Sequence, residues 1–210
     1  KVFSIKKTYS RGNLVSIYPK KDPLPLPSPM EATVPRVQDL AIRGHGTGRV
    51  IGIVPGQILT EALCLDVEGE KIPDTDRDIL KVVVCSRYRK GMTAVGLVHG
   101  FGMHTGAIAG SVAHDAHNLV AVGADDVSIR EALLPIIRSG GGLAASDGKT
   151  TTLLPLECAG LMSLLPAEDV ASRLGALHER AEMLGAVPGS FMYLSFLCLT
   201  VIPHLRITER

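Results

Sequence analysis

Between residues 49 and 123 the sequence repeats one pattern, in which short runs of apolar and often β-branched residues are each ended by glycine, proline or aspartate. Runs of this length and composition are typical of buried β-strands. We expect strands over residues 49–54, 58–67, 79–87, 92–99, 106–113 and 119–123. So many consecutive strands constrain this part of the chain to form a β-sheet.

The spacing of the apolar residues changes after residue 125. They now recur at intervals of three and four, with Asp125 or Asp126 as the acceptor at the start and glycines 140–142 at the end, which predicts an amphipathic helix. Residues 142–145 and 150–157, joined by the turn Asp147-Gly148, predict a hairpin. Two further helices are expected over 167–186 and 191–199. Strands followed by helices indicate an α+β fold, with helices packed on a mainly antiparallel sheet.

The first part of the chain differs in composition from the rest. Residues 20–35 hold five prolines, which fix extended backbone and favour a linker or an arm on another surface. We therefore expect residues 1–45 to be a β/proline-rich segment of a composite or small β domain, and residues 46–210 to be the α+β domain. Because the chain begins with Lys1, its N-terminus is interpreted as a cut or processed end.

Composition excludes several classes of partner. Lys and Arg total 22 against 21 for Asp and Glu, and aromatic residues make up 4% with no Trp, so neither a basic field nor stacking platforms favour nucleic acid. No apolar run reaches the roughly 18 residues of a membrane-spanning helix. Cys64, Cys85, Cys158 and Cys198 are far apart and lack a Cys-x-x-Cys pair, which favours reduced thiols in a cytoplasmic protein.

The densest group of chemically active side chains is Ser-Val-Ala-His-Asp-Ala-His-Asn, residues 111–118. His114 and His117 could share a ligand or a metal, or they could be hydrogen-bonded structural histidines. Asp115 could orient an imidazole or accept a proton, or it could bond to its own backbone in a turn. Ser111 and Asn118 offer the donors and acceptors that read a heterocycle, although asparagine is also common in turns.

Several segments resemble, in collinear order, the adenine deaminases of the amidohydrolase superfamily. Beside Ser111-Val-Ala-His-Asp-Ala-His-Asn118, they are Val50-Ile-Gly-Ile-Val-Pro-Gly-Gln-Ile-Leu-Thr60, Asp76-Arg-Asp-Ile-Leu-Lys81, Gly96-Leu-Val-His-Gly-Phe-Gly102, Gly106-Ala-Ile-Ala109, Gly140-Gly-Gly-Leu143, Leu154-Pro-Leu156, Ala159-Gly-Leu-Met162 and residues 191–206. The resemblance covers about residues 28–210 and only the C-terminal region of such an enzyme. Met103-His104 and the variable segment 85–91 depart from the family's pattern.

The resemblance implies a metal-dependent hydrolase of purine catabolism. In that family a (β/α)₈ barrel precedes this region, and a hydroxide on its manganese or iron attacks adenine, which yields hypoxanthine and ammonia. The His-x-His pair of the barrel is not in this sequence. We therefore expect no metal ligand in this chain. The expected partners are adenine, the catalytic barrel domain and further copies of the same protein in a homo-oligomer. The chain alone is expected to be inactive.

The resemblance also suggests roles for the candidate residues. His114 or His117 would polarise a ring nitrogen or carry a proton to the departing amine, with Asp115 orienting that imidazole. Ser111 and Asn118 would bind the edge of the purine. The alternatives are a purine-binding module without catalysis and a structural or oligomerisation domain. The first would bind adenine without releasing ammonia, and the second would bind no ligand.

Overall fold

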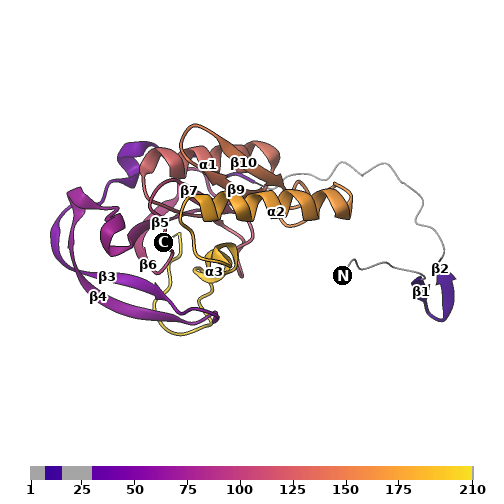
Figure 1. Ribbon diagram of the computed structural model, residues 1–210, viewed down its shortest axis with the longest axis horizontal. Coiled ribbons are helices and arrows are strands. Elements are labelled where there is room, and N and C mark those ends of the chain that lie inside the picture. Colours follow the sequence, from indigo (N-terminus) through magenta and orange to yellow (C-terminus); the bar gives the residue numbers. More distant parts are fainter. Residues whose placement is uncertain (1–7, 16–29, 210) are drawn as a thin grey trace.

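Eight strands form one twisted sheet in the computed structural model, which describes residues 8–15 and 30–209 (Figure 1). The strand order is β10-β9-β7-β8-β5-β6-β3-β4. Every neighbouring pair is antiparallel except β3 and β6. These strands are β3 (His45–Ile53), β4 (Thr60–Glu68), β5 (Ile79–Cys85), β6 (Thr93–His99), β7 (Ala107–Gly110), β8 (Leu119–Gly123), β9 (Gly142–Ser146) and β10 (Thr151–Pro155).

Three α-helices and three short 3₁₀ helices complete the described part of the chain, together with a separate two-stranded hairpin. The helices are α1 (Asp126–Ser139), α2 (Ala167–Met183) and α3 (Ser190–Phe196), with 3₁₀ turns at Val37–Leu40, Gly69–Lys71 and Thr75–Arg77. The hairpin consists of β1 (Thr8–Ser10) and β2 (Asn13–Val15). The predicted α+β class with a mainly antiparallel sheet is confirmed. Among the described helices, none is long and apolar enough to cross a membrane.

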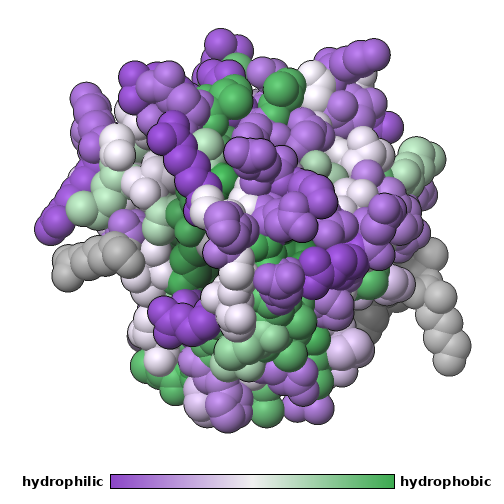
Figure 2. Space-filling model, turned by 90° about the vertical axis from the view of Figure 1, so that its left-hand side faces the viewer, coloured by the Kyte–Doolittle hydropathy of each residue, from purple (hydrophilic) through white to green (hydrophobic). Residues whose placement is uncertain are grey.

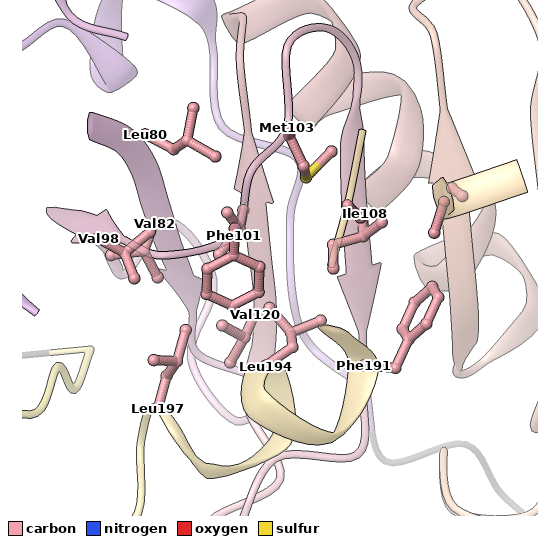
Figure 3. Close-up of a cluster of buried hydrophobic side chains, with 14 of the residues drawn as sticks. Leu80, Val82, Val98, Phe101, Met103, Ile108, Val120, Phe191, Leu194 and Leu197 are labelled. Carbon is pink, nitrogen blue, oxygen red and sulfur yellow. The ribbon is translucent and has the colours of Figure 1, made fainter. Parts of the chain in front are cut away.

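The centre of the sheet is buried on both faces, which explains the continuous apolar runs in the sequence. Successive side chains of a strand point to opposite faces. In β5, Val82 and Val84 therefore join the cluster on the α2–α3 side, whereas Val83 and Cys85 join the cluster beneath α1. Figure 3 shows the first cluster, in which Leu194 of α3 lies among residues of the sheet.

Helix α1 begins and ends where the sequence predicted. The Asp125 carboxylate accepts a hydrogen bond from the backbone N–H of Ser128 at 2.7 Å, which caps the helix. Gly140 ends it in the left-handed conformation, with φ of 80°. Ile129 and Leu133 are buried against the sheet, as the three- and four-residue spacing requires. Helices α2 and α3 cover the opposite face (Figure 1).

The β3–β4 hairpin forms one edge of the sheet and has its own small core around Val50 and Leu97. Figure 2 shows the molecule from this side, where hydrophilic residues cover most of the surface and hydrophobic residues show between them. The edge strand β4 carries Glu61, Asp66 and Glu68. Charged side chains on an edge strand oppose pairing with another sheet.

Of the proline-rich residues 20–35, residues 20–29 lie outside the described residues, as do residues 1–7 and 16–19 of the predicted segment 1–45. The part that follows packs on the α+β domain. Ala32 and Leu40 are buried in the cluster beneath α1, and Arg130 Nε of α1 donates to the Pro35 carbonyl at 2.8 Å. The division of the chain at residue 45 stays a prediction.

Candidate functional site

Residues 111–118, named here the histidine loop, connect the antiparallel neighbours β7 and β8. Both strands are fully buried, so the two ends of the loop are fixed by the centre of the sheet. Within the loop, Ser111 and Asn118 are buried, His114 and His117 are half-buried, and Asp115 is exposed. All five predicted site residues thus lie where β7 ends and β8 begins, but they differ in how far they are buried.

The Ser111 hydroxyl acts both as a hydrogen-bond donor and as an acceptor within the protein. Its Oγ donates to the Gly160 carbonyl at 2.6 Å and accepts from the Gly142 N–H at 2.9 Å. The hydroxyl therefore joins β9 and the turn at residues 158–162 to the start of the histidine loop. In this position it supports the backbone rather than facing open space, while its predicted role in purine binding stays a prediction.

Replacing Ser111 with alanine should lower the free energy of unfolding by about 2 kcal/mol, because the buried N–H of Gly142 loses its side-chain acceptor. Denaturant unfolding followed by circular dichroism measures this change. Ser163→Ala is a suitable control, since Ser163 Oγ accepts one local 3.3 Å bond from the Leu165 N–H. An equal effect of the two substitutions would contradict the bridging role of Ser111.

Asn118 also uses its amide within the protein. Its Oδ1 accepts from the Arg87 backbone N–H at 3.2 Å, and its Nδ2 donates to Glu209 Oε2 at 2.8 Å. Asn118 therefore ties the end of the histidine loop to the end of β5 and to the C-terminal segment. The purine-binding role expected for this amide stays a prediction, and a ligand that used the amide would have to exchange one of these bonds.

The two imidazoles lie close to each other, with ring centroids 5.5 Å apart in an edge-to-face arrangement. The His114 ring also packs on Phe196 of α3, with centroids 4.9 Å apart, and the backbone N–H of His114 donates to the backbone carbonyl of Ser195 at 2.8 Å. Helix α3 therefore orients His114, which leaves His117 as the histidine without such a support.

His117 has the features of a proton-accepting side chain. Its backbone is in the left-handed region with φ of 51°, and its Nδ1 is buried without a hydrogen-bond partner in the described part of the chain. Burial lowers the pKa of His117, and the charges of His114 and Arg87 lower it further, while the Asp115 carboxylate raises it. The neutral imidazole, which can accept a proton, is thus favoured.

Asp115 is exposed and does not hold either imidazole among the residues that the structure describes. Its electrostatic effect on His117 is the smallest of the four influences on that pKa. The orienting role expected for Asp115 therefore has no hydrogen bond to support it here, and it stays a prediction.

Sequence reasoning missed Arg87, which reaches the histidine loop from the end of β5. Arg87 is buried, with 3% of its surface exposed, and its Nη2 donates to the Ala159 carbonyl at 2.7 Å. A charged residue that closely follows a fully buried strand was the available signal. The neighbouring Tyr88 and the turn at Gly160 were missed as well, because nothing in the local pattern relates them to residues 111–118.

The donor groups of this chain bear on the metal that the resemblance implies. Over residues 8–15 and 30–209, no group of three or more His, Cys, Asp or Glu side chains is placed to hold a metal ion. His114 and His117 lie together, but their carboxylate neighbour Asp115 turns to solvent. The side chains described here therefore do not fit a resident metal centre.

Comparison with known proteins connects this geometry to one family. The family described as "Adenine deaminase C-terminal domain" matches residues 57–210. The chain is 55% identical over 208 residues to an adenine deaminase of Methanoculleus marisnigri, which covers 99% of this chain and 40% of that protein. It is 51% identical over 210 residues to one of Methanoregula boonei and 41% over 226 residues to one of Desulfatibacillum aliphaticivorans, with 99% of this chain covered in each.

The chain spans about two fifths of the length of these curated relatives, namely 40%, 38% and 39%. The matched region includes β4 to β10, all three α-helices and the whole histidine loop. The resemblance noted from the short motifs is thereby confirmed over most of the described fold. The chain belongs to the family of adenine deaminase C-terminal domains.

Proposed function

We propose that this chain acts as the C-terminal part of an adenine deaminase, which converts adenine and water to hypoxanthine and ammonia. The main support for this proposal is that the family match includes the histidine loop. Two imidazoles lie side by side in this loop, and the Nδ1 atom of His117 has no hydrogen-bond partner among the described residues. The metal implied by the resemblance, manganese or iron, would be bound by another part of the enzyme and would supply the attacking hydroxide. This assignment makes the chain a hydrolase component of purine catabolism.

His117 is the residue we assign to proton transfer. Deamination requires a proton for the departing amine, and a neutral imidazole can take up a proton and then deliver it. The lowered pKa of His117 keeps the imidazole in the neutral form near pH 7. His114 lies beside it and is oriented by Phe196, which suits His114 to contact the purine or to support the partner ring.

The remainder of the enzyme would cover the surface around the histidine loop. Tyr88, whose hydroxyl bonds to the Ala116 carbonyl, is 57% exposed. Met162 lies in the turn at residues 158–162 beside Arg87 and is 60% exposed, and Leu164, shortly after this turn, is 50% exposed. Large exposed apolar side chains around a polar loop are typical of a surface that another domain covers. The predicted barrel domain would therefore pack here, with the histidine loop toward its active site.

The cysteines support a reducing compartment, such as the cytoplasm. Cys64, Cys85, Cys158 and Cys198 are all free thiols. Burial raises the pKa of Cys85 to about 11 and that of Cys198 to about 12, so both thiols stay protonated and unreactive. Assembly of the enzyme into a homo-oligomer is a further part of this proposal.

The proposal is tested by ammonia release from adenine, measured with manganese for the full-length enzyme that contains this chain. We expect His117→Asn to lower kcat at least about tenfold, because the ring that carries the proton is lost. His45→Asn is the matched control, since His45 is exposed at the start of β3. Unchanged turnover in the His117 variant would overturn the role of this histidine.

The 210-residue chain alone should release no ammonia from adenine, with or without manganese. Metal-dependent turnover by the isolated chain would contradict the division of labour proposed here. Binding of adenine to the isolated chain, combined with an unaffected His117→Asn enzyme, would favour a purine-binding module instead.

A further inference from the structure

Two consecutive residues in the bend just after β5 hold the histidine loop on both sides of His117. The Tyr88 hydroxyl donates to the carbonyl of Ala116 at 2.9 Å. The backbone N–H of Arg87 donates to the side chain of Asn118 at 3.2 Å. Ala116 and Asn118 are the immediate neighbours of His117 in the sequence. The position of the His117 backbone is therefore set by contacts from the segment that follows β5.

The Arg87 side chain adds a second attachment, this time to the turn at residues 158–162. Its Nη2 donates to the carbonyl of Ala159 at 2.7 Å, and the next residue, Gly160, lies directly against the guanidinium. A Cβ on Gly160 would come within 2.6 Å of Arg87 Nη2. The Gly160 carbonyl in turn accepts from Ser111 Oγ. Ser111, at the start of the histidine loop, thus bonds directly to this turn. Arg87 links the turn to Asn118, at the other end of the loop.

Stability alone does not explain a buried arginine here. None of the six ion pairs recorded for the described residues includes Arg87, and its Nε is buried without a partner. A buried cation that lacks a carboxylate partner lowers stability, and a well-packed apolar residue often serves a fold better at such a place. Its contacts instead concentrate on the segments around His117, which indicates a role in positioning.

We infer that Arg87 and Tyr88 are positioning residues for His117, acting through Asn118, Ala116 and the turn at residues 158–162. The inference rests on the proposed role of His117 in deamination. Electrostatics support the inference. Burial is the largest cause that lowers the pKa of His117, the charges of His114 and Arg87 lower this pKa further, and only the Asp115 carboxylate raises it. Arg87 thereby favours the neutral imidazole as well as its placement.

The first test uses NMR on the 210-residue chain, which measures positioning without any catalysis. In Tyr88→Phe, the ring stays but the bond to Ala116 is lost, so we expect amide hydrogen exchange at His117 to become about fivefold faster. In Arg87→Met, we expect the pKa of His117 to rise toward its ordinary value, while Arg87→Lys, which keeps the charge, should leave it nearer that of the unmodified chain. Arg89→Met is the control, because Arg89 is exposed two positions further on.

The second test asks whether the positioning matters for the reaction. In the full-length enzyme, Tyr88→Phe should lower kcat for ammonia release about fivefold with KM and melting temperature unchanged, whereas Arg89→Met should change none of the three. A merely structural role of Tyr88 would instead lower the melting temperature together with the activity. Because Tyr88 is exposed, this variant is expected to fold even if Arg87→Met does not.

The outcomes separate the two proposals. Unchanged amide exchange in Tyr88→Phe, together with an unchanged pKa of His117 in Arg87→Met, would overturn the positioning role whatever the activity of the enzyme. If the NMR effects occur while His117→Asn leaves turnover intact, the contacts of Arg87 and Tyr88 stand as structural facts, but their positioning role in deamination falls together with the proposed role of His117.

Discussion

Replacing Asp126 with alanine should lower the free energy of unfolding by about 3 kcal/mol, because it leaves the ammonium group of Lys81 buried without its carboxylate. Lys81 lies within the buried strand β5, where its side chain is 4% exposed, and its Nζ is 2.6 Å from Asp126 Oδ1. A buried charge without a partner is among the few changes that cost this much. Denaturant unfolding of the purified chain measures the loss.

The matched control removes the charge instead of its partner. Lys81→Met keeps an unbranched apolar stem beside Val83 and should change the free energy of unfolding by less than about 1 kcal/mol, because the Asp126 carboxylate that remains is 22% exposed and lies in the first turn of α1, where the helix dipole favours a negative charge. The double variant, Asp126→Ala with Lys81→Met, should recover most of the stability lost in Asp126→Ala. If the double variant were as unstable as Asp126→Ala alone, the ion pair would not be the cause.

Gly141→Ala should lower the free energy of unfolding by about 3 kcal/mol or more, since both the backbone angle and the space around it favour glycine. Gly141 has φ of 144°, and a Cβ there would lie 2.1 Å from Gly160 Cα and 2.8 Å from the Leu156 carbonyl oxygen. Both obstacles are backbone atoms, so side-chain rotation cannot relieve the clash. Thermal or denaturant unfolding of the chain measures this effect.

A second glycine provides the control for Gly141. Gly175 lies within α2, where an added Cβ would meet nothing within 4 Å. Gly175→Ala should therefore raise the free energy of unfolding by about 0.5–1 kcal/mol, because alanine favours the helix. Equal effects at the two positions would contradict the close approach of residues 141 and 160.

The elements of the fold could be predicted because their signals are local. The strands from β3 to β8 follow from apolar runs ended by glycine, proline or aspartate, and α1 follows from its spacing and its Asp125 cap. Helix α3 ends at Phe196, three residues before the predicted end. The order of the strands was not predictable, because β6 pairs with the distant β3 in parallel and β5 lies between β6 and β8. Such pairings depend on which faces pack together rather than on any local pattern.

The histidine loop was recognisable in the same local way. Its five polar residues are consecutive or nearly so, and its flanking strands are short and apolar, so the sequence determined both its chemistry and its place between two buried strands. Short motifs in collinear order were likewise enough to identify the family, which the match over residues 57–210 confirms.

Only the tertiary structure decided what surrounds each of these residues. It directs the hydroxyl of Ser111 and the amide of Asn118 to protein partners and places His114 on Phe196. It also brings Arg87 and Tyr88 to either side of His117. These contacts join segments separated by 28 to 91 residues, and a side chain's hydrogen bonds and pKa depend on neighbours in space. Sequence spacing therefore determined which groups are present, and the packing of the sheet decided how they are used.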